Sequence, residues 1–369
     1  MRSGPEAVIG RRDVLTGAGL LATAGATLSF PTPAIAQRIR QLTMVTDWPE
    51  TLPGLHTSAL RLSQTIDMAT GGRVKITVFP AGALVRPFET FDAVAAGVAD
   101  MYHSFEAYFE NKSRAFCFFS ALPFGLTADE QFAWINYGGG QELWDTLAGQ
   151  FNIKSLLCLS TGTQMGGWFV RGIASPEDLK GLRYRMAGLG AEMLRRLGAI
   201  AVTLPVGEII PALKSGAIEA TEWIAPWPDM AMGLHEAARY YYYPGFHEPG
   251  SGIAIGINKT VWESFDANDK KIIEVVAASE YARSLAEYNA NNAQSLRKLR
   301  DQGVVKILKF DDALLKRFLA LSRDVVAEIG SGDDLSRKIY ANYQQFRASI
   351  MDWTNISERA YLNSRSLAG

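Results

Sequence analysis

The chain has 369 residues, of which 48% are hydrophobic and 20% charged, so it can bury a large core and is not a disordered protein. At roughly 100–200 residues per domain, this length favours about two domains. The 37 basic and 38 acidic residues give a net charge of −1, which excludes a nucleic-acid partner because no basic excess can neutralise a phosphate backbone. Two cysteines exclude a disulfide scaffold.

Residues 1–36 have the three parts of an export signal. Arg11 and Arg12 precede a mildly apolar run over 14–30, and the segment ends in small residues. The run is too short and too rich in glycine for a membrane span, which needs about 20 apolar residues. The paired arginines indicate twin-arginine export, the alternative being an ordinary export signal that contains two arginines. We therefore expect a periplasmic protein that starts at Gln37 after cleavage.

Strands and helices are predicted to alternate through the first two thirds of the chain. In the first part the predicted strands are 40–45, 74–79 and a segment leading into Met101, and the helices are 55–70 and 87–96. This order predicts a mainly parallel sheet with helices on both faces. The pattern then repeats, with strands at 153–160, 167–170, 182–186, 202–204 and 220–223 and helices at 191–197 and 208–214. No linker separates the two α/β units, so segments are expected to cross between them.

The last third is predicted to be helical, over 267–300, 311–329 and from Asp334 onward. In the third helix, five apolar residues recur at steps of four and three: Ile339, Tyr343, Phe346, Ile350 and Trp353. Such a seam is typical of a helix that packs along another helix. A symmetric partner would cover it, so we expect a homodimer, the alternative being that the helix lies on its own domain.

The common enzyme motifs are absent from the sequence, which has no H-E-x-x-H, G-x-S-x-G, P-loop or C-x-x-C pattern. Gly188 and Gly190 follow a predicted strand, but Met193 occupies the third glycine position of a dinucleotide loop, so no nucleotide site is expected. Cys117 and Cys158 lie among apolar residues, which disfavours a thiolate and leaves open whether the two thiols pair.

Polar residues stand at the ends of predicted strands in the second unit. Gln164 lies in a turn between two strands, Glu222 ends a third, and Glu248 lies in a loop whose prolines and glycines fix its backbone. Ligands bind at such strand ends in open α/β sheets. Arg185 lies inside a strand and needs a planar anion, either a ligand carboxylate or a structural acid. Together these residues could hold a small carboxylate, with a cation offsetting the acids.

Three stretches resemble the solute-binding proteins of tripartite ATP-independent periplasmic (TRAP) transporters, the DctP family. They are 71–84 (GGRVKITVFPAGAL), 179–185 (LKGLRYR) and 205–220 (PVGEIIPALKSGAIEA). The resemblance extends over essentially the whole mature chain. Gln164, the pair Glu222–Trp223 and the segment 241–250 (YYYPGFHEPG) are similar to the branch that binds α-keto acids and lactate.

The resemblance implies a two-lobed periplasmic binding protein fold of the α/β class, with mixed sheets, crossing segments and a helical C-terminal extension. The expected parts are a first lobe over 37–160, a second lobe over 161–260, long helices and a strand returning across both over 261–330, and a C-terminal helix over 331–369. Members of this family are not enzymes; they capture a solute and deliver it to permease subunits in the membrane. The solute expected here is a small 2-oxo or 2-hydroxy monocarboxylate.

The same resemblance implies a role for each polar residue. Arg185 would clamp the ligand carboxylate, and Gln164 would touch both the ligand and a cation. Glu222 would supply metal oxygens, Trp223 would lend its backbone carbonyl, and Glu248 would close the metal shell beside the ligand. Hard oxygen ligands of this kind suit Na+ or Ca2+, and the sequence does not choose between the two ions.

Two points remain open at the level of the sequence. Tyr102, His103 and Tyr108 lie near a predicted strand end in the first unit and could cover the ligand, or they could pack in the core. The alternative function is an exported metal-dependent lyase or hydrolase that uses Glu222 and Glu248, although no pair of histidines is placed to act as its general base.

Overall fold

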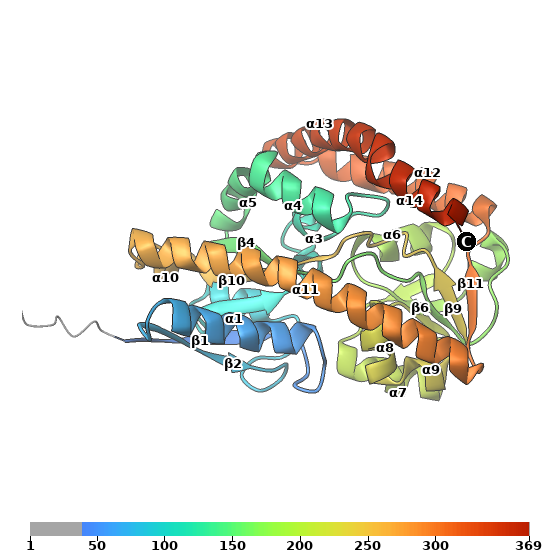
Figure 1. Cartoon of the computed structure of the whole chain (residues 1–369), viewed down its shortest axis with the longest axis horizontal. Coiled ribbons are helices and arrows are strands. Elements are labelled where there is room, and N and C mark those ends of the chain that lie inside the picture. Colours follow the sequence, from blue (N-terminus) through green and yellow to red (C-terminus); the bar gives the residue numbers. More distant parts are fainter. Residues whose placement is uncertain (1–38, 369) are drawn as a thin grey trace, which may run out of the picture. The chain divides into compact units, whose positions relative to one another are not determined.

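The computed structural model describes residues 39–368, which form two mixed β-sheets flanked by helices (Figure 1). The expected signal peptide, residues 1–36, lies outside the described residues. Among the helices of the described part, none is both long enough and apolar enough to span a membrane. The expected α/β class with mixed sheets is confirmed.

The first sheet has the strand order β2-β1-β3-β10-β4. Its strands are β1 (Arg40–Thr46), β2 (Val74–Phe79), β3 (Met101–Ser104), β4 (Ile153–Ser160) and β10 (Gly252–Asn258). β1 pairs in parallel with β2 and β3, whereas β10 runs antiparallel between β3 and β4. The expectation of a mainly parallel sheet therefore holds only for β1, β2 and β3, because β10 returns to this sheet from a distant part of the chain.

The second sheet has the strand order β11-β9-β5-β8-β6-β7. Its strands are β5 (Gly167–Phe169), β6 (Arg183–Arg185), β7 (Ile200–Val202), β8 (Ala220–Thr221), β9 (Tyr240–Tyr243) and β11 (Lys306–Lys309). β6 runs parallel to β7 and β8, while β5 runs antiparallel to β8 and β9. The strand expected at 202–204 begins two residues earlier, and Trp223 lies beyond the end of β8.

Three segments connect the lobes: the chain between β4 and β5, the chain between β9 and β10, and a long helix. β10 follows β9 along the chain but pairs in the first sheet, so residues 252–258 lie in the first sheet although the sequence placed them in the second unit. The long helix α11 (Ala267–Gln302) contacts β4 and α1 (Leu55–Ala69) on one side and α8 (Pro226–Met232) on the other. Figure 1 shows α11 running past all three elements. The crossing segments expected between the units are thus present.

The sequence did not predict the helical region between β3 and β4. It contains α3 (Cys117–Ser120), α4 (Ala128–Tyr137) and α5 (Gly140–Gly149), and α5 packs on β4. Cys117 and Cys158 are both buried and unpaired, and burial raises the pKa of each thiol. The remaining helices are α2 (Thr90–Ala95), α6 (Gly188–Arg196), α7 (Val206–Ser215), α9 (Leu234–Ala237), α10 (Lys259–Glu263), α12 (Asp312–Gly330), α13 (Asp334–Ile356) and α14 (Glu358–Arg365).

The apolar seam of α13 is covered mainly by its own chain. Ile339 and Tyr343 are buried, and the Tyr343 hydroxyl accepts a hydrogen bond from the Leu126 amide at 3.0 Å. α13 packs on α12, α5, α4 and α3, most of which the sequence did not predict. The expectation that this seam needs a partner is therefore wrong for its first half, whereas Trp353 at its end is 62% exposed.

A buried carboxylate ties together the core of the first sheet. Glu106, in the turn after β3, is fully buried and accepts hydrogen bonds from the Tyr102 hydroxyl, the Ser155 hydroxyl and the Trp144 indole. Burial raises the pKa of Glu106 to about 7, and the three hydrogen bonds oppose that rise. Because an ordinary glutamate has a lower pKa in the unfolded chain, folding takes up a proton at this residue.

We expect Glu106 to make the protein less stable as the pH rises. The raised pKa contributes stability that is present below about pH 4.5 and is lost as the pH rises through about 7. Glu106→Gln removes this titration, so the stability of the native protein relative to the variant should fall between pH 5 and pH 8, by on the order of 1–3 kcal/mol. Urea unfolding of both proteins at several pH values measures the difference. A difference independent of pH would contradict the assignment.

Candidate functional site

A small cavity is lined by residues of both lobes. Trp48, Phe105 and Tyr108 come from loops that follow β1 and β3 of the first sheet. Arg185 is the last residue of β6, and Glu222 directly follows β8. Arg185 and Glu222 therefore lie at the carboxyl ends of strands, as the sequence predicts for a ligand site, whereas Glu248 and Ser251 precede β10.

Arg185 is almost completely buried, with 1% of its surface exposed. Its Nη1 donates to the side-chain Oε1 of Glu222 and, at 3.2 Å, to the backbone carbonyl of the same residue. Its Nε donates to the Leu204 carbonyl at 3.3 Å. Nη2 is buried and has no hydrogen-bond partner among the described residues. Arg185 is thus paired with a structural acid, Glu222, and it also has a donor available for a ligand carboxylate.

Pairing between strands explains why residue 222 meets residue 185. β6 and β8 are parallel neighbours in which Arg185 stands opposite Thr221. The Glu222 amide donates to the Arg185 carbonyl at 3.1 Å, which continues the ladder by one residue. The guanidinium also lies over the Trp223 ring, 5.4 Å from its centroid. This register places a buried cation, a carboxylate and an aromatic face at one point of the cavity.

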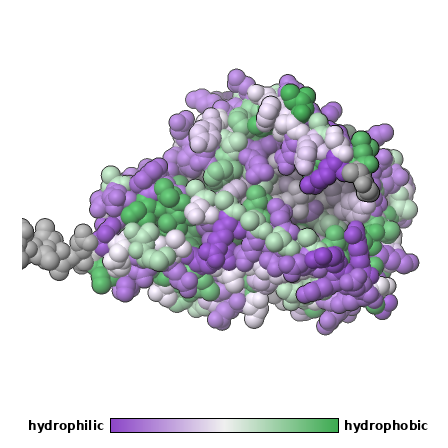
Figure 2. All heavy atoms as spheres, in the orientation of Figure 1, coloured by the Kyte–Doolittle hydropathy of each residue, from purple (hydrophilic) through white to green (hydrophobic). Residues whose placement is uncertain are grey.

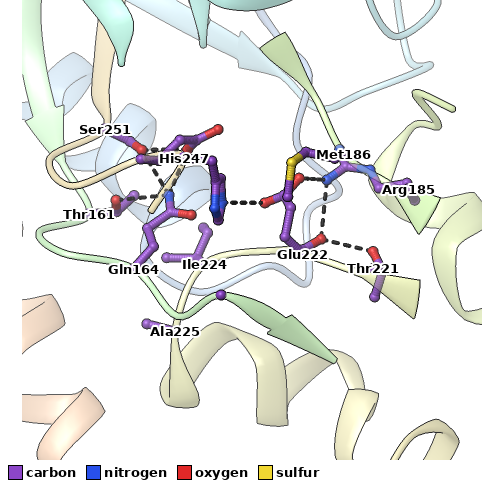
Figure 3. Close-up of polar contacts among 12 residues, drawn as sticks. Thr161, Gln164, Arg185, Met186, Thr221, Glu222, Ile224, Ala225, His247 and Ser251 are labelled. Carbon is purple, nitrogen blue, oxygen red and sulfur yellow. Dashed lines mark hydrogen bonds and ion pairs between the residues drawn. The ribbon is translucent and has the colours of Figure 1, made fainter. Parts of the chain in front are cut away.

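A second strand pair brings Gln164 to Glu248. β4 and β10 are antiparallel, and Ser160 at the end of β4 stands opposite Gly252 at the start of β10. The chain that leaves β4 and the chain that enters β10 therefore lie side by side. Gln164 Nε2 donates to Glu248 Oε2 at 2.8 Å and to the Ser251 hydroxyl at 2.8 Å. Figure 3 shows the Gln164 amide pointing toward Ser251.

The Gln164 amide oxygen faces no hydrogen-bond donor. Gln164 is 4% exposed, and its Oε1 is buried without a partner in the described part of the chain. The loop is held in place by Gly245, whose amide donates to the Gln164 carbonyl at 2.9 Å. A Cβ atom at Gly245 would lie 2.5 Å from that carbonyl oxygen, so only glycine fits there. The arrangement leaves one fixed, unused acceptor in a closed site.

His247 is a site residue that the sequence analysis missed. It is 1% exposed, and its Nε2 lies 3.5 Å from Glu222 Oε2 (Figure 3). Potential ligand atoms of Glu222, His247 and Glu248 lie within 4.8 Å of one another. Nothing in the sequence marks this histidine except its position beside Glu248.

The electrostatics of this cluster favour a positive charge. Burial and the negative charge of Glu222 together raise the pKa of Glu248. Burial alone lowers the pKa of His247, but the two carboxylates outweigh it, and the pKa lies above the ordinary value. Two buried acids next to one another are costly unless a proton or a cation lies between them.

The structure brings together most of the residues that the sequence singled out. Gln164, Arg185, Glu222, Trp223, Glu248 and Tyr108 all line the cavity. The Trp223 carbonyl accepts no hydrogen bond from residues 39–368, so it is a free oxygen beside Glu222. The nonpolar part of the lining, which the sequence did not identify, includes Trp48, Leu55, Phe105, Ile224 and Ile253.

Tyr102 and His103 do not line the cavity. Both are completely buried residues of β3. The Tyr102 hydroxyl bonds Glu106, and the Trp48 indole donates to His103 Nδ1 at 2.8 Å. Burial lowers the pKa of His103 to about 3, so this ring is neutral. Their place in the core follows from the position of β3 in the middle of the sheet, which the sequence did not predict.

The donor set fits a hard cation and an organic acid. A free amide oxygen, two carboxylates and a free carbonyl are the oxygen ligands that Na+ and Ca2+ prefer. The unused Arg185 Nη2 is a donor of the kind that binds a carboxylate. The residues present therefore suit a metal ion and a small anion held side by side.

A family model of bacterial extracellular solute-binding proteins, family 7 (DctP), matches residues 45–333 of the chain. The chain is 36% identical, over 88% of both sequences, to a monocarboxylate 2-oxoacid-binding periplasmic protein of Nostoc sp..

Solved structures of TRAP solute-binding proteins are also similar. One, from Bordetella bronchiseptica RB50, contains copurified calcium and picolinate; it superposes with a TM-score of 0.87 at 33% identity, covering 90% of this chain and 98% of that one. Another, from Pseudoalteromonas atlantica T6c, contains sodium and pyruvate; its TM-score is 0.85 at 31% identity, covering 89% of this chain and 99% of that one. A third, from Colwellia psychrerythraea, contains calcium and pyruvate; it has the same TM-score and identity and covers 89% of this chain and 100% of that one.

Proposed function

The chain belongs to family 7 of the bacterial extracellular solute-binding proteins, and we propose that it captures a small 2-oxo or 2-hydroxy monocarboxylate together with Na+ or Ca2+. Like its relatives it is a transport receptor and not an enzyme. The observation that carries the proposal is a pair of unused buried polar atoms in one cavity, the donor Arg185 Nη2 and the acceptor Gln164 Oε1.

Each of these atoms needs a partner of a definite kind. An unpaired buried donor or acceptor costs about 1–3 kcal/mol. A carboxylate would satisfy Arg185 Nη2, and a cation would satisfy Gln164 Oε1, while a 2-oxo or 2-hydroxy oxygen next to the carboxylate could reach the cation as well. The pyruvate bound by two similar proteins has this chemistry.

The cation would be held by Gln164 Oε1, the Glu222 carboxylate, the Trp223 carbonyl and Glu248. Glu222 is bonded to Arg185 in this structure. A ligand carboxylate on Arg185 would compete with that bond and leave Glu222 free to turn toward the ion. The ion in turn would lower the repulsion between Glu222, Glu248 and the anionic ligand.

Family membership places the protein in the periplasm and implies membrane permease subunits as the partners that receive the solute. We propose export by the twin-arginine route on the basis of Arg11 and Arg12 in the sequence.

We also propose a homodimer formed through the C-terminal helices. Trp353, Ile356 and Tyr361, at the end of α13 and in α14, are 62–75% exposed. Figure 2 shows hydrophobic residues on the surface of this region among hydrophilic ones. Large apolar side chains that recur along one exposed segment favour a second copy as their cover. The similar Bordetella bronchiseptica protein is a dimer.

Replacing Arg185 should weaken binding of pyruvate strongly. Arg185→Ala removes the donor of the carboxylate and leaves Glu222 unpaired, which should cost about 3–5 kcal/mol. Arg185→Lys should not restore binding, because an ammonium cannot make the two parallel bonds of a guanidinium. Calorimetry with pyruvate measures both variants, and Arg183→Ala, at the exposed end of the same strand, is the matched control. Near-native affinity in Arg185→Ala would refute the role.

Removing the cation should abolish binding of monocarboxylates. After chelation and exchange into choline buffer we expect no pyruvate binding, and addition of Na+ or Ca2+ should restore it. Glu222→Gln should weaken the response to the ion, since it removes a charged oxygen ligand. Glu208→Gln, an exposed residue of α7, serves as the control. Undiminished affinity in metal-free choline buffer would show that the acids serve another purpose.

The dimer should depend on the exposed end of α13. We expect the full chain to be dimeric at micromolar concentration by light scattering. Trp353→Ser combined with Ile356→Ser should give a monomer that keeps its pyruvate affinity, because both residues lie outside the cavity. Met68→Ser, which alters an exposed apolar residue of α1, should leave the dimer intact. A monomeric native chain would end this proposal.

A further inference from the structure

A further buried acid, outside the cavity, lies behind the proposed cation site. Asp229, in the first turn of α8, is 1% exposed and does not line the cavity. Its Oδ1 accepts hydrogen bonds from the backbone amides of Ile224 and Ala225, both at 3.0 Å. Its Oδ2 accepts from the Trp168 indole and the Tyr241 hydroxyl, both at 2.7 Å. All four bonds to this carboxylate come from N–H or O–H donors.

One of these bonds fixes the direction of the Trp223 carbonyl. The Ile224 N–H and the Trp223 C=O belong to the same planar, trans peptide unit, so they point in opposite directions. Holding the N–H on Asp229 therefore directs the carbonyl oxygen away from Asp229. Trp223 lines the cavity, and its carbonyl accepts no hydrogen bond within residues 39–368.

The neighbouring peptide units are fixed as well. The Met165 amide donates to the Ile224 carbonyl at 2.9 Å, one residue beyond Gln164. The two side chains that donate to Asp229 Oδ2 are packed against each other, since the rings of Trp168 and Tyr241 stack with centroids 3.8 Å apart. The segment that carries Glu222 and Trp223 is thus clamped between the second sheet and the Gln164 loop.

We propose that Asp229 is a positioning residue of the cation site, acting through the Trp223 carbonyl. The inference rests on the proposed function, since it assumes that this carbonyl binds the ion. Asp229 aims the oxygen, because its Oδ1 holds the Ile224 N–H of the same peptide unit. Groups that orient metal ligands in this way typically change metal affinity by about 10–100-fold when mutated.

The test separates cation affinity from ligand affinity. In Asp229→Asn, whichever way the amide turns, its NH2 group meets an N–H donor, either the Trp168 indole or the backbone amides. We expect the concentration of Na+ or Ca2+ that gives half-maximal pyruvate binding to rise at least about 10-fold. The pyruvate affinity at saturating cation should stay within about 3-fold of the native value.

Two further variants separate positioning from general stability. Trp168→Phe removes a donor to Oδ2 only and should leave the cation requirement unchanged. Trp168→Phe combined with Asp229→Asn should restore the native cation requirement. In this double variant the amide NH2 can face the Tyr241 hydroxyl, while the amide oxygen still accepts hydrogen bonds from the two backbone amides. Asp229→Glu keeps the carboxyl group but moves its oxygens, so it should raise the cation concentration needed for pyruvate binding. It is the variant to use if Asp229→Asn does not fold.

The outcomes are distinct. A native protein that binds pyruvate without any cation overturns the proposed function and this inference with it. A native protein with a cation requirement that Asp229→Asn and Asp229→Glu leave unaltered overturns this inference alone. An equal loss of pyruvate affinity at all cation concentrations would also overturn it, since that result indicates a damaged cavity rather than a misdirected carbonyl.

Discussion

The buried ion pair between Arg185 and Glu222 is the constraint on which the rest of the site depends. Taking these two charges out of water costs several kcal/mol each, so they must be paired closely. The register of β6 against β8 pairs them, yet the Nη2 group of the guanidinium has no hydrogen-bond partner among the described residues. The second sheet therefore supplies a charged centre that is stable without a ligand and remains able to bind one.

The first sheet supplies the opposite wall through two of the three segments in which the chain crosses between the lobes. Gln164 follows β4, and Glu248 precedes β10, four residues from the paired ends of these antiparallel strands. Both residues are thus attached directly to β10 and β4, neighbouring strands at one edge of the first sheet, while they contact the second. A change in the relative position of the lobes would separate the oxygens of Gln164 and Glu248 from those of Glu222, so ion binding and lobe position are coupled by the backbone.

Local patterns in the sequence were sufficient to locate Arg185, Glu222 and Gln164, because a polar residue at the end of an apolar strand stands out without knowledge of its neighbours. The pattern could not place β10 in the first sheet, since pairing between distant strands leaves no local signal. The missing pairing of β10 also explains why Tyr102 and His103 were wrongly expected in the site, since it is β10 that makes β3 a central, buried strand. Asp229 was missed for a different reason: an acid in the first turn of a helix is commonplace, and only its contacts reveal a role.

Glu222 has two incompatible tasks in the proposed mechanism, and this conflict couples the ligand to the ion. As long as its carboxylate neutralises Arg185, it is a poor cation ligand; once it turns to a cation, Arg185 lacks an anion. A monocarboxylate on Arg185 resolves the conflict, because it replaces Glu222 as the partner of the guanidinium. Binding of the ion then increases the affinity for the monocarboxylate, and binding of the monocarboxylate increases the affinity for the ion by the same factor, as linkage requires. In this mechanism the ion has one ligand that is already in place, the Trp223 carbonyl oriented by Asp229. A second ligand, the Glu222 carboxylate, becomes available only when the solute takes its place on Arg185.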